Sequence, residues 1–222
     1  MMELKQIEKS FSAGEVSEQV LKDVTLTIES GKLTALTGVS GSGKSTLLSI
    51  AAGLQSTTSG SVLFDGRDLT ALDQEALRAL RAGSFGFIFQ SSYLVPFLTA
   101  AEQLELMLKT SGRKLSKKTA PAEISRILTR VGMEHRPDAH PDTMSGGEKQ
   151  RIAIARALIH QPKIVFADEP TASLDSKRSH DIMKLLKDMT TNTGTAVLMV
   201  THDEEMLRYA DRVVEMRDGQ IK

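Results

Sequence analysis

Two patterns of apolar and polar residues recur along the chain, and they predict strands and helices respectively. Residues 24–29 alternate between apolar and polar, which is typical of a half-buried antiparallel strand. Short apolar runs predict further strands over residues 33–37, 61–64, 85–89, 163–169 and 195–200. Helices are predicted over residues 44–54 with Leu54 on the apolar face, over 73–82 with an end at Gly83, and over 121–132.

The order of these elements predicts an α/β protein with a helical part inserted into it. Residues 2–30 read as paired strands, and a capping box at Thr99 and Glu102 opens a stretch of helices. We therefore expect one domain over residues 1–222, with a helical subdomain over about 92–158. The sheet core and an N-terminal antiparallel β-subdomain are expected over 1–91 and 159–222. A turn is expected at Ser12–Glu15 and a solvated loop at Lys109–Thr119.

Composition narrows the class of protein only a little. The 222 residues are 40% hydrophobic and 25% charged, as in soluble globular proteins, and no apolar run approaches the length of a membrane span. The 28 basic residues balance the 28 acidic ones, which argues against nucleic acid as the main partner. The chain has no cysteine and no apolar signal region at its start, so we expect any membrane-spanning part to be another polypeptide.

The stretch Gly38–Thr46 predicts a site for phosphate. It fits the pattern G-x-x-x-x-G-K-[ST], in which the amides of a glycine-rich turn surround phosphate groups. A strand is predicted before it and a helix after it, and the N-terminus of a helix favours an anion. Lys44 would then reach the β- and γ-phosphates and the Ser45 hydroxyl would hold Mg²⁺, whereas a surface turn that matches by chance is the alternative.

A second stretch, Met144–Arg151, predicts another surface for an anion. Ser145 and Glu148 fit a capping box at the start of a helix. Capping does not explain Gly146 and Gly147, because glycine is a poor helix former, whereas close approach of an anion to the backbone does. One nucleotide has no evident need of two such surfaces from a single chain.

Polar residues end three of the predicted strands, at the edge where open α/β sheets bind their ligands. Gln90 follows one strand, Asp168 and Glu169 end another, and His202 follows the last. Neighbouring strand residues face opposite ways, so one carboxylate can serve Mg²⁺ while the other orients and deprotonates a water; two solvated loop acids are the alternative. The other histidines, expected to be caps or surface residues, are His135, His140, His160 and His180.

Taken together, these motifs resemble the nucleotide-binding subunits of ATP-binding-cassette proteins over the whole chain. The matching segments are Gly38–Thr46 (Walker A), Gln90 (Q-loop), Met144–Gln150 (signature), Ile164–Asp168 (Walker B), Ser173–Asp175 (D-loop) and His202 (switch histidine). In the signature, Met144 replaces the usual leucine and Glu148 the usual glutamine. The resemblance implies a P-loop NTPase core of the RecA-like type that binds and hydrolyses ATP with Mg²⁺.

The resemblance also implies a role for each matching residue. Those implied in catalysis are Glu169, His202, Lys44 and Gln90. Those implied in binding the nucleotide are Phe11, Gly38, Ser40, Gly41, Ser42, Gly43, Lys44, Ser45, Thr46, Ser145, Gly146, Gly147 and Asp175. Phe11 would stack on adenine, whereas the residues alone favour a partly buried anchor at this position. The implied magnesium ligands are Ser45, Gln90 and Asp168.

Partners and a location follow from the same resemblance. Two subunits would pair head to tail with ATP between them, and they would bind two copies of a separate permease at the cytoplasmic side of the cell membrane. The chain is most similar to the group for lipoprotein release, macrolide efflux and haem export, and its residues 90–97, 145–151 and 167–175 look most like haem-exporter subunits. We therefore expect haem efflux, with lipoprotein release or efflux of antimicrobial peptides or macrolides as the alternative.

Two other classes of protein share part of the pattern. DNA-repair and chromosome-organising ATPases separate the motifs by long coiled coils, whereas about 55 positions without sustained heptads separate Gln90 from Ser145 here. A small-molecule phosphotransferase would need an acceptor lid and no Ser-Gly-Gly loop. The sequence thus favours a transporter ATPase, for which the apolar stretch Tyr93–Leu98 is a candidate permease-docking surface, with local packing as the alternative reading.

Overall fold

The computed structural model of the protein describes residues 1–13, 16–113, 116 and 119–222. The expected turn at Gly14 and Glu15 and part of the expected loop over 109–119 lie outside the described residues. The strands are β1 (Met2–Ala13), β2 (Val16–Ile28), β3 (Leu33–Thr37), β4 (Ser59–Phe64), β5 (Arg67–Asp68), β6 (Phe85–Ile88), β7 (Ile164–Asp168), β8 (Ala196–Val200), β9 (Arg212–Arg217) and β10 (Gln220–Ile221). The helices are α1 (Lys44–Ala51), α2 (Gln74–Ser84), α3 (Ala100–Thr110), α4 (Thr119–Arg130), the 3₁₀ turn η1 (Pro141–Thr143), α5 (Gly146–Leu158), α6 (Ser176–Thr193) and α7 (Glu204–Leu207).

The strands form two sheets that differ in direction. Strands β2, β1, β4 and β5 lie side by side in this order and pair antiparallel. The order in the other sheet is β10–β9–β3–β8–β7–β6, and its strands from β9 to β6 run parallel. A parallel sheet with an N-terminal antiparallel sheet confirms the predicted α/β class.

Alternate residues of the parallel strands belong to two different cores. In β7, Ile164 and Phe166 pack into a core with α1 and the antiparallel sheet. Val165 and Ala167 face the other way and pack with helices α3 to α7, and β8 alternates in the same manner. Strands that are buried on both faces read as continuous apolar runs, which is why the sequence revealed them.

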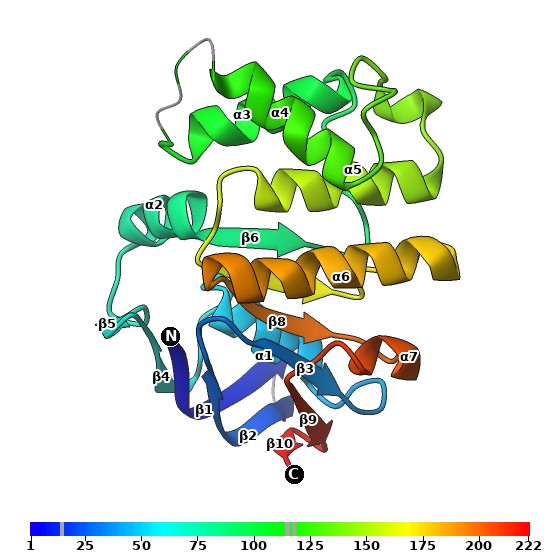
Figure 1. The fold of residues 1–222 in the computed structure, drawn as a ribbon. Coiled ribbons are helices and arrows are strands. Elements are labelled where there is room, and N and C mark those ends of the chain that lie inside the picture. The colour runs from blue at the N-terminus through cyan, green and yellow to red at the C-terminus, as the bar shows by residue number, and fades with distance from the viewer. Residues whose placement is uncertain (14–15, 114–115, 117–118) are drawn as a thin grey trace.

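Helices α3, α4 and α5 gather at one end of the molecule, away from the antiparallel strands (Figure 1). The predicted capping boxes are both present, at Thr99 with Glu102 for α3 and at Ser145 with Glu148 for α5. Helix α5 also packs against β6, so it joins the helical end to the sheet. Within the part of the chain that the structure describes, no helix is both long and apolar enough to cross a membrane.

Several predicted element boundaries were wrong, among them both ends of the helix predicted over 121–132, which is α4 (Thr119–Arg130). Helix α1 ends at Ala51, and Leu54 lies beyond it with 49% of its surface exposed instead of on the buried face. The cause is Gly53, whose φ of 61° ends the helix, and the Leu54 N–H closes the turn by donating to the Ser49 carbonyl at 2.9 Å. Helix α2 continues through Gly83 to Ser84, and β6 ends before Phe89.

His160 was expected at a cap or on the surface, and this prediction was also wrong. The residue follows α5 and is buried in the core, with Nε2 2.9 Å from the Phe85 carbonyl oxygen. Burial lowers the pKa of its imidazole, and Nδ1 has no hydrogen-bond partner among the described residues. A lone histidine carries no periodic signal, so the sequence pattern could not place it.

Candidate functional site

The loop Gly38–Thr46 connects β3 to α1, and its backbone requires glycine at two positions. Gly38 has a φ of 134°, and a Cβ there would lie 2.1 Å from the Met216 carbonyl oxygen. Gly43 has a φ of 97°, and a Cβ there would lie 2.7 Å from Leu21 Cδ2. A larger residue at Gly38 would therefore collide with the backbone of β9, and one at Gly43 would displace the Leu21 side chain and press on the Val20 carbonyl oxygen at 3.1 Å.

The Lys44 side chain folds back over this loop. Its Nζ donates to the carbonyl oxygens of Gly38 and Val39, both at 2.8 Å, and lies 3.4 Å from Ser42 Oγ. Lys44 is also the first residue of α1, whose first turn contains no acidic residue. The ammonium, the free amides of the helix and its dipole thus place positive potential at the same point.

The carboxyl ends of β6, β7 and β8 complete a cavity beside the loop. This cavity has a volume of about 580 Å³. Its lining residues are Glu18, Val20, Gly38, Ser40, Gly41, Gly43, Lys44, Ser45, Thr46, Gln90, Asp168, Glu169, Val200 and His202. The structure therefore brings together all the residues predicted to be catalytic or to hold magnesium, as parallel strands that end at one sheet edge should.

Asp168 and Glu169 have different surroundings. Burial raises the pKa of Asp168, and a hydrogen bond with Ser45 partly opposes this shift. Glu169 Oε1 lies 2.7 Å from His202 Nδ1, and Glu169 Oε2 accepts from the Thr201 hydroxyl at 3.3 Å. The hydrogen bond and charge of Glu169 raise the pKa of His202. With a φ of 49°, Glu169 adopts the left-handed conformation that residues other than glycine rarely take, as do six other described residues outside this cavity.

The Ser145–Gly147 surface lies in a separate cavity of about 680 Å³. Its lining residues are Thr129, Arg130, Val131, Gly132, His135, Ser145, Gly147, Glu148, Arg151, Ser173, Leu174, Asp175, Arg178, Asp181 and Ile182. Gly146 is exposed, and a Cβ there would meet nothing within 4 Å. Among the described residues, the two cavities have no lining residue in common.

Phe11 is the predicted nucleotide-binding residue whose place is least direct. Phe11 is not among the described lining residues of the first cavity. It lies opposite Glu18 where β1 pairs with β2, and Glu18 lines that cavity. Its exposed ring lies 5.1 Å from Lys9 Nζ. The stacking of Phe11 on adenine stays a prediction.

Sequence reasoning gave no role to Glu18, Val20 or Thr201. Glu18 and Val20 line the first cavity from β2, which no motif marks. Thr201 holds Glu169, and its place directly before His202 at the end of β8 was the available signal.

The parallel sheet, the glycine-rich loop and the ring of polar residues define a nucleotide-binding protein of the P-loop type. A profile of the family described as "ABC transporter" matches residues 21–172. The chain belongs to the ABC transporter family, in which it forms an ATPase cassette. The family and the activity that the motifs predicted are thereby confirmed.

Relatives cover the whole chain. It is 44% identical to the putative hemin import ATP-binding protein HrtA of Staphylococcus haemolyticus, over 100% of this chain and 99% of that protein. It is 41% identical to the macrolide export ATP-binding/permease protein MacB of Shigella flexneri, over 100% of this chain but 34% of that protein. The ATP-binding cassette MJ0796, solved as a dimer in a post-hydrolysis state bound to ADP and Pi, matches with a TM-score of 0.95 and 38% identity, over 100% of this chain and 97% of that one.

Proposed function

We propose that two copies of this chain pair head to tail and hold ATP between the Gly38–Thr46 loop of one copy and the Ser145–Gly147 surface of the other. The observation that carries this proposal is that one chain has two surfaces suited to phosphate in cavities with no shared residue among those described. Each surface covers one side of a phosphate chain, so a second copy completes the site. The dimeric state in the solved structure of MJ0796 supports this arrangement.

In this composite site the loop amides and Lys44 bind the phosphates of ATP, and Phe11 stacks on its adenine. Ser45 and Asp168, which line the cavity together, provide hard oxygen ligands, as does the side-chain amide of Gln90. Mg²⁺ usually takes one or two carboxylates and completes its shell with waters and phosphate oxygens, so this donor set fits it. When bound, the ion neutralises the charge that develops on the transferred phosphoryl group.

Hydrolysis is assigned to the residues around Glu169. Its carboxylate orients a water and accepts a proton from it as the water oxygen bonds to the γ-phosphorus, and the bond from that phosphorus to the β,γ-bridging oxygen breaks to release ADP and phosphate. His202 and Thr201 each contact a different oxygen of this carboxylate and so fix its orientation. Asp175, which caps α6 beside the second cavity, lies where the partner's nucleotide would approach.

We further propose that the dimer drives two copies of a separate permease, at the cytoplasmic side of the cell membrane, and that the cargo is exported hemin. The name of the hemin relative supports the cargo, and the name of the macrolide relative supports export, whereas the hemin relative is itself named for import. Export of macrolides, antimicrobial peptides or lipoproteins is the alternative, and the name of the macrolide relative supports the first of these.

The composite site is tested with Glu169→Gln. Glutamine keeps the size of glutamate but accepts no proton, so turnover should fall by about 10²–10⁴-fold while ATP binding persists. ATP should then hold two copies together on gel filtration, and ADP should not. Ser145→Arg in the same chain should abolish the dimer. Hydrolysis by Glu169→Gln at the parent rate would remove Glu169 from this role.

The cargo is tested in cells that lack the gene. If hemin is exported, these cells should accumulate more hemin than cells that carry the gene when hemin is added to both. Returning the parent gene should remove this difference, and returning the Glu169→Gln gene should not. Less intracellular hemin than in cells that carry the gene would indicate import, and equal concentrations would exclude hemin as the cargo.

A further inference from the structure

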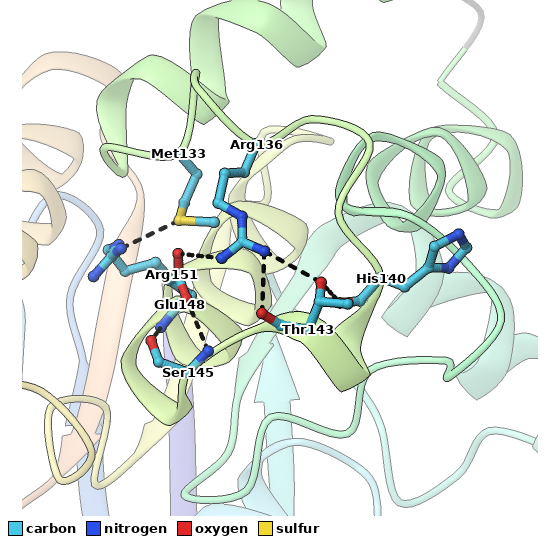
Figure 2. Close-up of polar contacts among 7 residues, drawn as sticks. All are labelled: Met133, Arg136, His140, Thr143, Ser145, Glu148 and Arg151. Atoms are coloured by element: carbon cyan, nitrogen blue, oxygen red, sulfur yellow. Dashed lines mark hydrogen bonds and ion pairs between the residues drawn. The ribbon is translucent and has the colours of Figure 1, made fainter.

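Arg136 lies outside the described lining of both cavities, yet it contacts the chain on either side of Ser145 (Figure 2). Its Nη1 donates to Glu148 Oε1 at 3.0 Å. Its Nη2 donates to the Thr143 carbonyl oxygen at 3.0 Å and to the Thr143 hydroxyl at 3.2 Å. Thr143 ends η1 and Glu148 lies in the first turn of α5, so the planar guanidinium bridges the two elements that flank the Ser-Gly-Gly surface.

Glu148 connects this bridge to Ser145 itself. Glu148 Oε2 accepts from the Ser145 N–H at 2.8 Å, and Ser145 Oγ accepts from the Glu148 N–H at 3.3 Å. The bond from Ser145, with the smaller effect of Arg136, lowers the pKa of Glu148 to about 2, so the carboxylate is charged at neutral pH. Both of its oxygens accept hydrogen bonds, which a glutamine could not match because it has one acceptor oxygen.

The loop that carries Arg136 is attached to the first turn of α3. The Ala101 N–H donates to the Pro137 carbonyl oxygen at 2.8 Å, and the Ala100 N–H donates to the Ala139 carbonyl oxygen at 2.9 Å. The Arg136 N–H donates to the Met133 carbonyl oxygen at 3.1 Å. The backbone that carries the Arg136 guanidinium is therefore held in place by hydrogen bonds, as a positioning role requires.

We propose that Arg136 is a positioning residue that holds the Ser145–Gly147 surface in the orientation that receives the ATP of the partner copy. Ser145 and Gly146 are exposed, and a Cβ built on Gly146 would have no atom within 4 Å apart from its chain neighbours and the backbone of its own helix, so the contacts of Arg136 lie on either side of an otherwise open surface. Arg136 acts through Glu148 and Thr143 and touches no nucleotide. This inference rests on the head-to-tail dimer proposed above.

The test compares Arg136→Ala, Arg136→Lys and Glu148→Gln in the full-length Glu169→Gln chain, with Arg126→Ala as the matched control. Arg126 pairs with Glu123 on the exposed side of α4, and the hydrogen bonds and ion pair described for its side chain are all with Glu123. Analytical ultracentrifugation with Mg²⁺ and ATP gives the dimer dissociation constant, and titration of the monomer gives ATP affinity. Arg136→Ala should raise the dimer dissociation constant about tenfold, with unchanged ATP affinity and with the Arg126→Ala value equal to the parent's.

Two further variants separate positioning from general damage to the fold. Lysine keeps the charge but offers no planar fork, so Arg136→Lys should give an intermediate value. If Arg136→Ala does not fold, Glu148→Gln, which keeps the shape of the side chain, should still weaken the dimer. Values within twofold of the parent for Arg136→Ala and Glu148→Gln would overturn the proposal. If the Glu169→Gln chain forms no ATP-dependent dimer, or Ser145→Arg leaves it intact, the proposed function itself fails and the positioning role fails with it.

Discussion

The ammonium group of Lys44 is held in place by hydrogen bonds to the phosphate-binding loop. The carbonyl oxygens of Gly38 and Val39 accept from its ammonium, so a flexible side chain is already ordered where phosphate would bind. Ordering a free lysine costs up to about 2 kcal/mol of side-chain entropy. A phosphate that meets a lysine ordered in advance avoids most of this cost, which favours binding.

The first prediction is that Lys44→Ala weakens ATP binding roughly 10- to 150-fold, because it removes charge-assisted hydrogen bonds to phosphate. The measurement is calorimetric titration with ATP, with circular dichroism to show that the fold persists. Lys109→Ala removes an exposed lysine that pairs with Glu105 far from the loop, and it should leave ATP affinity unchanged. Equal ATP affinity of Lys44→Ala and the parent would contradict the phosphate-loop assignment.

A second prediction at this scale concerns His160 and pH. Burial lowers its pKa in the folded chain from the ordinary value of 6.5, with a smaller contribution from Arg113. Below pH 6.5 the unfolded chain binds a proton that the folded chain does not, so the free energy of unfolding should fall as the pH falls from 6.5 to the folded pKa. His160→Gln keeps an N–H that can donate to the Phe85 carbonyl and has no titration. Urea unfolding at several pH values should show a smaller loss for this variant; equal losses would exclude the contribution of His160.

At the scale of elements, the sequence predicted the parts whose signal is local. Strands β3, β7 and β8 were found because both of their faces are buried, and α3 and α5 were found from their capping boxes. Motifs that follow β3, β6, β7 and β8 then identified all the residues predicted to be catalytic, and these line one cavity. The end of α1 was misplaced because the apolar Leu54 matches a helical period that Gly53 interrupts.

Contacts between segments that are distant along the chain could not be predicted from the sequence. Arg136 lies in the loop after α4 and contacts Glu148 in α5, and neither the spacing nor the composition of the chain predicts this pair. His160 became buried because the C-terminal end of α5 packs beneath β6. Both facts depend on how elements pack together, which a reading based on local periodicity does not contain.

The segment between β6 and α3 leads to the third prediction. Phe97 is 76% exposed and Tyr93 is 69% exposed, although Tyr93 also contacts the Phe89 ring edge-on at 5.6 Å between centroids. Two exposed aromatic side chains in one segment are suited to a partner, and we expect Phe97→Glu to weaken co-purification with the proposed permease while ATP affinity stays unchanged. The control is Leu106→Glu, which changes another exposed apolar residue in the helical end of the molecule and should leave co-purification unchanged. Unfolding of Phe97→Glu would show that the segment serves local packing.

At the scale of the whole molecule, the separation of the two cavities bears on the symmetry of the dimer proposed above. In that dimer a twofold axis would present each loop to the other copy's Ser145–Gly147 surface and would form two equal sites. Each site then consists of the Lys44 side from one chain and the Ser145 side from the other. A defect in either half would disable both sites of a pure mutant dimer.

Mixed dimers therefore provide the final prediction. Lys44→Ala and Ser145→Arg should each have little ATPase activity alone, because every site in either dimer has one damaged half. A mixed dimer has one site in which both halves are intact and one in which both are damaged. Mixing equal amounts should therefore restore part of the parent activity, because each mixed dimer has one intact site that can hold ATP and hydrolyse it. The measurement is steady-state phosphate release from the mixture and from each variant alone. If each site were contained within one chain, every chain in the mixture would remain damaged and no activity would return.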